Sequence, residues 1–395
     1  MKPYVRESWV EIDLDAIAAN VQAIKRHIPD TARVMAVVKA NAYGHGSVQV
    51  AREALESGAD CLAVATLEEA EVLRKAGITA AILILGFTPV SAVRVAVELD
   101  IELTAWDVAW LEEAEQLLAG QDVSQPLGIH VKVDTGMGRL GVCEADDLLL
   151  VAGKLNASSV LRWSGIFTHF ACADEPDTEH VQAQHKRFQQ LLDHLRQNGF
   201  TLPQVHACNT AAAIAFPEWS YDLVRFGIGL YGLYPSAYIQ AQGLINLTPA
   251  LSLKTTIANV KRIDQPSTIS YGATYTAQPG EWIATLPIGY ADGYSRMLSN
   301  RGAALYNGVR VPVVGKVCMD QIMVRIEDGH PQRGDEVVLY GKQGDQEISV
   351  DEVADLLGTI NYEVTCMLKT RLPYVYLKKG QCVEGCHLLT NKSWE

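Results

Sequence analysis

The sequence predicts an α/β protein, with a (β/α)8 barrel of the TIM type followed by a mainly β C-terminal domain. Between residues 30 and 232, short apolar runs alternate with amphipathic stretches in roughly eight repeats, as parallel strands joined by helices require. After about residue 243 the pattern changes to longer alternating segments rich in Thr, Val, Ile and Tyr, which favour β-strands. These two sequence patterns indicate two domains.

We expect the barrel to span residues 1–243, of which the first ten or so can join the other domain, and the β domain to span 244–395. The expected barrel strands are 32–39, 61–66, 81–86, 101–105, 128–134, 163–170, 204–209 and 223–230. No obvious linker separates the two halves, so we expect them to pack closely.

Three local signals refine this outline. Thr66 followed by Glu69 is a capping-box pattern and predicts that a helix starts there. Asn307-Gly308 between two alternating runs predicts a two-residue hairpin turn. The segment 349–358, with Ser349 and Glu352 as its cap, predicts one short helix within the β domain.

The composition excludes several classes of function. A net charge of −13 and a pI near 5.3 argue against non-specific nucleic-acid binding and favour a small-molecule partner. The start of the chain carries charges where a signal peptide needs an apolar stretch, and no apolar run is long enough to span a bilayer, so we expect a cytoplasmic protein without a membrane partner. The eight cysteines are dispersed, and we expect no disulfides. Cys382 and Cys386-His387 lack a second ligand pair, so no metal site is expected.

Unusual polar residues follow the expected strands, where the active face of a barrel lies. Lys39 closes the apolar run 35–38, where an ammonium group either snorkels outward or is converted, for example into a Schiff base. In the fifth strand, His130, Lys132 and Asp134 share one face, and a glycine-rich loop ending in Arg139 follows.

The last three strands end in residues suited to an anionic ligand. Strand six ends in Thr168-His169, where a histidine is more often a structural residue than a catalyst, and strand seven ends in His206-x-x-Asn209-Thr210. Strand eight carries Arg225, Gly227 and Ile228, and backbone amides exposed by glycines at this place commonly hold a phosphate.

Taken together, the segments VVKANAYGHG, KVDTGMGRLG, FTHF, VRFGIGLYGL, SYGATY, GYADGY and VCMDQ resemble the alanine racemase family, in order and through nearly the whole chain. The resemblance implies a pyridoxal 5′-phosphate (PLP) enzyme that interconverts L- and D-alanine, with the cofactor carried on Lys39 as a Schiff base. The residues that the resemblance assigns to the cofactor are Lys39, Tyr43, Arg139, His169, Asn209, Thr210, Arg225, Gly227, Ile228 and Tyr362. Among them, Tyr43, Thr210, Gly227, Ile228 and Tyr362 would bind the phosphate.

The resemblance also implies how the proton moves. Racemisation needs a base on each face of the α-carbon, and these would be Lys39 and Tyr271, the latter contributed by a second subunit of a homodimer. Arg225 would face the pyridine nitrogen and leave it unprotonated, which favours racemisation over transamination. A hydrogen-bonded chain through His169, Arg225 and His206 would tune Tyr271. Lys132 resembles a lysine that is often carbamylated and then pairs with Arg139.

The substrate would be bound by Arg139, Met319 and Tyr290, and the tyrosines at the entrance favour a small amino acid. Thr210 stands where serine is usual, and Lys316 where arginine is frequent, which leaves strict alanine preference open. Three alternatives remain. These are a serine-preferring or broad-specificity racemase, a PLP decarboxylase of similar architecture, which Arg225 opposes, and a non-catalytic PLP-binding barrel, which Tyr271 opposes.

Overall fold

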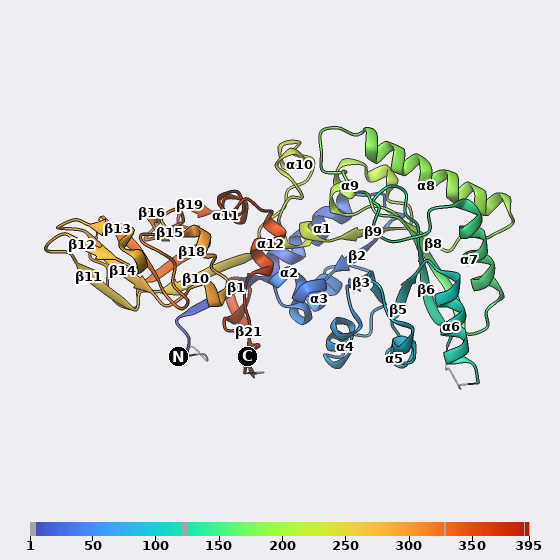
Figure 1. Cartoon of the computed structure of the whole chain (residues 1–395), viewed down its shortest axis with the longest axis horizontal. Helices are drawn as coiled ribbons and strands as arrows, with labels where there is room; N and C mark the ends of the chain where they lie inside the picture. Colours follow the sequence, from blue (N-terminus) through green and yellow to red (C-terminus); the bar gives the residue numbers. More distant parts are fainter. Residues whose placement is uncertain (1–4, 121–124, 328, 391, 395) are drawn as a thin grey trace. The chain divides into compact units, whose positions relative to one another are not determined.

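The computed structural model describes residues 5–120, 125–327, 329–390 and 392–394, which form two compact units (Figure 1). One unit comprises Ile17–Ala42 and Gly46–Thr248. The other combines the described part of Met1–Ala16 with Tyr43–His45 and Pro249–Glu395. The second unit therefore includes both ends of the described chain.

The first unit is a closed barrel of eight parallel strands, as the sequence predicts. The strands, each paired with the next and the last with the first, are β2 (Arg33–Val37), β3 (Cys61–Val64), β4 (Ile82–Ile84), β5 (Glu102–Ala105), β6 (Leu127–Lys132), β7 (Leu161–Phe167), β8 (Gln204–His206) and β9 (Leu223–Phe226). Their apolar side chains are almost entirely buried, because a parallel barrel is covered by helices outside and filled by side chains inside.

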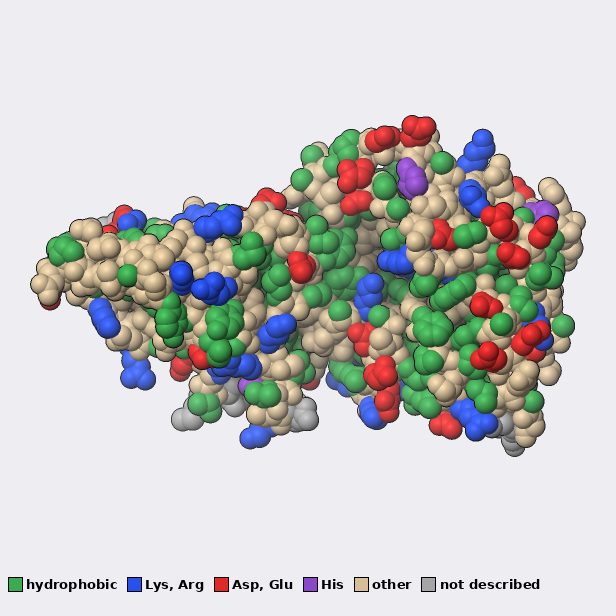
Figure 2. Space-filling view, viewed as in Figure 1, with side chains coloured by type: hydrophobic (Ala, Val, Ile, Leu, Met, Phe, Trp, Pro, Cys, Tyr) green, Lys and Arg blue, Asp and Glu red, His purple; other side chains and the backbone are tan. Residues whose placement is uncertain are grey.

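Helices connect the strands, and Figure 1 shows α3 to α8 around the outside of the barrel. The helices are α1 (Leu14–His27), α3 (Ser47–Glu56), α4 (Leu67–Lys75), α5 (Val93–Glu98), α6 (Val108–Leu118), α7 (Ala145–Ala157), α8 (Glu179–Gln197), α9 (Thr210–Ala215) and α10 (Ala237–Ala241), with short 3-10 turns η1 (Val90–Ala92), η2 (Pro217–Trp219) and η3 (Ile228–Tyr231). On the face drawn in Figure 2, acidic and basic side chains are interspersed over these helices.

Helix α4 begins as expected, because the Thr66 hydroxyl accepts the Glu69 N–H as its N-cap. The Glu69 carboxylate does not complete the capping box. It accepts the N–H groups of Ala65, at 2.8 Å, and of Ala40, at 2.6 Å. This side chain therefore fastens the backbone that directly follows Lys39.

The segment after Lys39, labelled α2 (Lys39–Gly44), has an uncommon backbone. Ala40, Asn41, Ala42 and Tyr43 all have φ between 51° and 54°, the left-handed region that costs an ordinary residue roughly 1–2 kcal/mol. Tight packing accompanies it, since a Cβ on Gly44 would lie 2.2 Å from the carbonyl oxygen of Thr365.

The second unit is built mainly from three antiparallel or mixed sheets. The large sheet has the strand order β16-β15-β18-β10-β1-β20-β21-β22, with β19 beside β18, and the smaller ones are β11-β14-β17 and β12-β13. The strands are β1 (Ser8–Asp13), β10 (Leu251–Thr256), β11 (Asn259–Arg262), β12 (Ser267–Ile269), β13 (Tyr275–Ala277), β14 (Trp282–Leu286), β15 (Ala303–Tyr306), β16 (Val309–Pro312), β17 (Ile322–Ile326), β18 (Glu336–Gln343), β19 (Gln346–Ile348), β20 (Pro373–Lys378), β21 (Gln381–His387) and β22 (Lys392–Trp394). The N-terminal strand β1 lies between β10 and β20.

The expected hairpin and helix are both present in this unit. Asn307 and Gly308, with φ of 48° and 75°, join β15 to β16. Ser349 caps α11 (Val350–Leu357) by accepting the Glu352 N–H, and the Glu352 carboxylate pairs with Arg310. The prediction of a single helix was wrong, because α12 (Asn361–Cys366) follows after a short connection. Its six residues are too few to show a helical period. Three 3-10 turns complete the unit, η4 (Tyr271–Ala273), η5 (Tyr290–Asp292) and η6 (Arg296–Leu298).

Candidate active site

The polar residues predicted for the barrel lie at the carboxyl ends of its strands. Lys39 comes two residues after β2, Lys132 ends β6, His206 ends β8 and Arg225 lies within β9. Because parallel strands present their carboxyl ends at one edge, these side chains are directed to one face of the barrel. The site is therefore assembled from strands far apart in the sequence.

Arg225 is the most highly connected of these residues. Only 3% of it is exposed, and its guanidinium donates to Thr168 O at 2.8 Å, Ala207 O at 2.7 Å, His206 Nδ1 at 2.8 Å and His169 Nδ1 at 3.2 Å. Burial lowers the pKa of Arg225 to about 10, so the group remains a cation at neutral pH. Four acceptors hold the guanidinium in one orientation.

The two histidines bound to Arg225 are held neutral. Burial, followed by the charge of Arg225, lowers the pKa of both His169 and His206 well below the usual range. The ring of His206 stacks on Phe167, with centroids 4.6 Å apart and planes 6° apart, and the Arg225 guanidinium lies over the same Phe167 ring at 5.2 Å. Both imidazoles can thus accept a hydrogen bond from Arg225.

Lys132 is buried next to this cluster. Its Nζ donates to Val133 O at 2.7 Å and lies 5.6 Å from the centroid of Phe167. Burial and the nearby Arg225 charge lower the pKa of Lys132 to about 7. An amine of this kind is partly unprotonated at neutral pH and is then a nucleophile.

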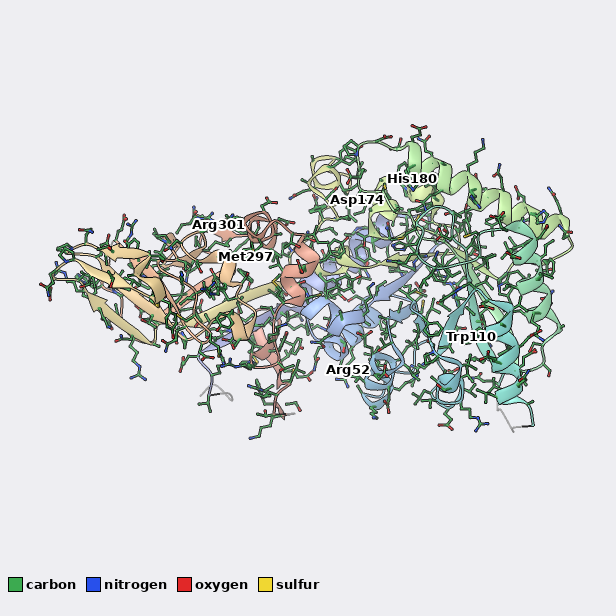
Figure 3. All side chains as sticks on the ribbon, viewed as in Figure 1. Arg52, Trp110, Asp174, His180, Met297 and Arg301 are labelled. Carbon is green, nitrogen blue, oxygen red and sulfur yellow. The ribbon has the colours of Figure 1, made fainter. Side chains whose placement is uncertain are left out.

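The glycine-rich loop after β6 is organised by Asp134. One carboxylate oxygen of Asp134 accepts the N–H groups of Gly136, Met137 and Gly138, at 2.9 to 3.1 Å, and the other accepts that of Arg139 at 3.0 Å. His180, labelled in Figure 3, contacts the same loop through Gly136 O at 3.2 Å. The Arg139 side chain is exposed, on a backbone fixed by Asp134.

A set of backbone and hydroxyl donors lies after β8 and β9. Asn209 caps α9 by accepting the Ala212 N–H, which places Thr210 at the first helical position. The Thr210 hydroxyl oxygen accepts the Gly227 N–H at 2.9 Å, so its own proton remains to be donated. Ile228 opens the 3-10 turn η3, and a Cβ on Gly229 would clash with Phe226 and Thr210.

Tyr271 and Met319 line one hollow of about 530 Å³ in the β unit, together with Ser270, Cys318 and Asp320 among others. Tyr271 is 72% exposed and Met319 52% exposed. Ser270 has φ 66° and ψ −179°, a conformation usually confined to glycine, and its hydroxyl donates to Lys316 O at 2.6 Å. This strained residue joins the Tyr271 turn to the segment that carries Met319.

Tyr290 is tied to the same segment. Its N–H donates to Cys318 O, and the N–H of Ala291 donates to Met319 O, both at 3.0 Å. The turn is closed by Asp292, fully buried, which accepts the Gly289 N–H and pairs with Arg6 at 2.6 Å and Arg371 at 3.5 Å. In the same unit, the rings of Tyr43 and Tyr362 lie 6.1 Å apart.

The structure thus gathers the predicted residues into two groups, one in each unit. The barrel group contains Lys39, Lys132, Arg139, His169, His206, Asn209, Thr210, Arg225, Gly227 and Ile228. The β-unit group contains Tyr43, Tyr271, Tyr290, Met319 and Tyr362. Among the described residues there is no cluster of His, Cys, Asp or Glu that could hold a metal ion. No helix of the described ranges is long and apolar enough to cross a membrane.

Sequence reasoning did not predict the supporting contacts of several carboxylates. Glu69 binds Ala40, Asp134 organises the glycine-rich loop, Asp292 closes the Tyr290 turn and Glu102 binds His130 at 3.2 Å. Glu102 could have been noticed, because it is an acidic residue near the start of an otherwise apolar strand segment. Asp292 gives no such signal, since its charged partners Arg6 and Arg371 come from distant parts of the chain.

Comparison with known proteins places these residues in a family. Residues 12–235 match the model of the alanine racemase N-terminal domain and 250–376 that of the C-terminal domain. Alanine racemase 2 of Bacillus subtilis is 59% identical over 378 residues, covering 95% of this chain and 96% of that protein. The crystal structure of alanine racemase from Bacillus anthracis with bound L-Ala-P has a TM-score of 0.93 at 44% identity, covering 99% of this chain and all of that one. A histidine racemase from Leuconostoc mesenteroides has a TM-score of 0.86 at 32% identity, covering 95% and 99%. The chain belongs to the alanine racemase family.

Proposed function

We propose that this protein is an alanine racemase that carries PLP on Lys39 and interconverts L- and D-alanine. The observation that carries the proposal is the buried Arg225, fixed by four hydrogen bonds at the carboxyl edge of the barrel. PLP enzymes that need a protonated ring nitrogen place an acid there, whereas a guanidinium can only donate. An arginine in this position suits racemisation.

The residues after the last two strands fit a phosphate. The Thr210 hydroxyl accepts the Gly227 N–H and still has a proton to donate, Ile228 opens the turn that follows, and Gly229 admits no side chain. Tyr43 and Tyr362 are proposed to add two phenols. Asn209 supports the same set as the cap of α9. When bound, PLP supplies an electron-withdrawing ring that acidifies the α-hydrogen of the attached amino acid.

Each neighbouring residue is proposed to have a specific role at the cofactor site. Arg225 donates toward the pyridine nitrogen and keeps it unprotonated, and His169 lies beside the ring. Arg139 contacts the ring hydroxyl and the substrate. Lys132, with a pKa lowered to about 7, is proposed to be carbamylated, because its unprotonated amine can attack carbon dioxide and the product is an anion suited to Arg139. Carbamylation would also remove one of two neighbouring buried positive charges, those of Lys132 and Arg225.

The two bases are Lys39 and Tyr271, one for each face of the α-carbon. The high exposure of Tyr271 in the single chain supports its contribution to the site of a second copy in a homodimer. The chain His169, Arg225 and His206 would tune this phenol from the barrel side. Tyr271 would act on the proton directly.

The substrate carboxylate is proposed to meet the Met319 segment, with Tyr290 beside it. Both are held by the Asp292 turn. A serine-preferring or broader racemase is the second candidate, since a histidine racemase shares the fold and Lys316 departs from the usual arginine.

The test is to incubate the purified holoenzyme with single-enantiomer amino acids and follow loss of optical rotation. We expect alanine to be racemised fastest and borohydride to fix a pyridoxyl group on Lys39. Faster racemisation of another amino acid would overturn the substrate, and an adduct on any other lysine would overturn the cofactor assignment.

A further inference from the structure

A chain of polar side chains runs through the barrel interior, away from the carboxyl edge. Starting from Arg225 on β9, Nη1 lies 2.8 Å from His206 Nδ1 on β8. His206 Nε2 lies 2.9 Å from His130 Nδ1 on β6, and His130 Nε2 lies 3.2 Å from a carboxylate oxygen of Glu102 on β5. Four strands of the barrel are therefore linked by three consecutive hydrogen bonds.

The direction of every hydrogen bond in this chain follows from Arg225. A guanidinium has no acceptor, so His206 Nδ1 must accept from it. His206 is neutral, and its single proton is then on Nε2, which donates to His130 Nδ1. His130 in turn carries its proton on Nε2 and donates to Glu102. At the other end, Arg225 Nη2 donates to His169 Nδ1, so the His169 proton is on Nε2.

The packing leaves these rings no freedom to turn. A Cβ on Gly165 would lie 2.2 Å from His130 Nδ1, so only glycine can stand opposite that ring. Phe167 stacks on His206 and supports Arg225. A Cβ on Gly128 would lie 2.7 Å from a Glu102 carboxylate oxygen, so a second glycine makes room for the carboxylate.

Glu102 is the terminal hydrogen-bond acceptor of this chain of side chains. Its side chain is 23% exposed and is also bound by Arg162 at 3.2 Å. Burial opposes ionisation of Glu102, but the hydrogen bond and charge of His130, with Ser164 and Arg162, outweigh it and lower its pKa to about 2. Asp134, the other acid near Lys132, is occupied by four loop amides. Glu102 is therefore ionised near neutral pH and can accept a hydrogen bond from His130.

We propose that Glu102 is a positioning residue for Arg225. Acting through His130 and His206, it fixes the tautomer of both imidazoles, keeps His206 Nδ1 free to accept, and so holds the guanidinium in the orientation that the reaction uses. The role in catalysis rests on the proposed function, whereas the order of donors and acceptors does not. Without this acceptor, either imidazole can take the other tautomer and Arg225 loses one of its fixed partners.

The experiment is long-range 1H–15N correlation NMR on protein labelled with 15N-histidine, without and with PLP, together with kcat and KM for alanine. Variants of each histidine assign the signals. We expect Nε2–H tautomers for His130 and His206 in the wild type, and mixed tautomers in Glu102→Ala. The same variant should lose about tenfold in kcat, comparable to one hydrogen bond to a charged group, with KM changed less than twofold. Glu102→Gln keeps an acceptor and should restore the tautomers and most of kcat.

Glu115→Gln is the matched control, because Glu115 on α6 also has a charged partner, Lys154 at 2.7 Å, but no link to the chain. It should change neither tautomers nor kcat. An Nδ1–H tautomer of His130 in the wild type would overturn the proposal even if Glu102→Ala did not fold. So would unchanged tautomers in a folded Glu102→Ala. Because the tautomers are measured without PLP as well, failure of the racemase assignment would appear separately, as absent activity in a wild type with the expected tautomers.

Discussion

The barrel and the β unit hold their reactive residues in opposite ways. In the barrel, Arg225 is almost fully buried and bound by four acceptors. In the β unit, Tyr271 and Met319 are largely exposed, and Tyr271 directly follows the strained Ser270. A buried, saturated cluster is complete within one chain, whereas exposed groups on strained backbone are suited to a ligand or chain that arrives later. This contrast supports the proposal that the barrel prepares the cofactor site and that the β unit serves a second copy.

The largest effects should come from the two bases. Lys39→Ala and Tyr271→Phe should each lower kcat/KM for alanine by about 10²–10⁴, the usual contribution of a general base. Tyr271→Phe should leave the thermal midpoint unchanged because the hydroxyl is exposed. Optical rotation assays measure kcat/KM, and a thermal melt measures the midpoint. Activity of either variant above a tenth of wild type would remove that residue from the mechanism.

Arg225→Glu should have the next largest effect. A carboxylate can share a proton with the ring nitrogen, so racemisation should fall while the ratio of pyruvate formed to alanine racemised rises. Arg225→Lys is the control, because it keeps the charge and should not raise that ratio. Circular dichroism must first show that both variants fold, since a glutamate would face the carbonyls of Thr168 and Ala207. An unchanged ratio in folded Arg225→Glu would contradict the role given to the arginine.

The barrel cluster should also make stability depend on pH. The pKa of Glu102 is lowered to about 2, so its contribution is present above about pH 4.5 and is lost as the pH falls toward 2. The pKa values of His169 and His206 are lowered as well. The unfolded chain therefore takes up protons below about pH 6.5 that the fold does not, and stability declines there too.

Urea unfolding of wild type and Glu102→Gln, at fixed protein concentration, measures the contribution of the Glu102 carboxylate to the free energy of unfolding. The lowering of the Glu102 pKa from 4.5 to about 2 corresponds to a difference of about 3 kcal/mol in the free energy of unfolding between the two proteins near pH 7. This difference should shrink steadily below pH 4. Matching curves for Glu115→Gln and wild type would assign the effect to the barrel interior. A difference between Glu102→Gln and wild type that does not vary with pH would contradict the lowered pKa.

The smallest effect is expected in the β unit. Lys316 Nζ lies 3.1 Å from the position that a Cβ on Gly272 would take, beside the Tyr271 turn. Lys316→Arg introduces a larger planar group there and should alter the ratio of kcat/KM for serine to that for alanine, by a few-fold at most. Equal ratios for the variant and wild type would identify Lys316 as a solvated charge without influence on specificity.

Much of the fold follows from local pattern. The eight barrel strands were predictable because each is a short buried run bounded by turn residues, and the Asn307-Gly308 hairpin and Ser349 cap are local signals. Helix α12 was not predictable, since six residues cannot show a period. The left-handed backbone from Ala40 to Tyr43 was also hidden, because three of its four residues carry no preference for that conformation.

The candidate site was predictable only in part. Strand ends point to Lys39, Lys132 and Arg225, and the family resemblance adds Tyr271 and Met319. The supporting carboxylates Glu69, Glu102 and Asp292 depend on contacts between distant segments that one sequence does not reveal. Their roles required the structure.

Mixing two inactive variants tests the central claim, that each site combines the barrel of one copy with Tyr271 of another. Lys39→Ala and Tyr271→Ala homodimers should each be nearly inactive. After dissociation and reassociation, a heterodimer carries both lesions in one site and none in the other. Random exchange makes about half of the dimers heterodimeric, so activity should recover to roughly a quarter of wild type. A mixture of tagged and untagged Lys39→Ala verifies subunit exchange and should show no recovery. If Lys39→Ala and Tyr271→Ala subunits exchange and activity still does not return, the two bases come from one chain and the account is contradicted.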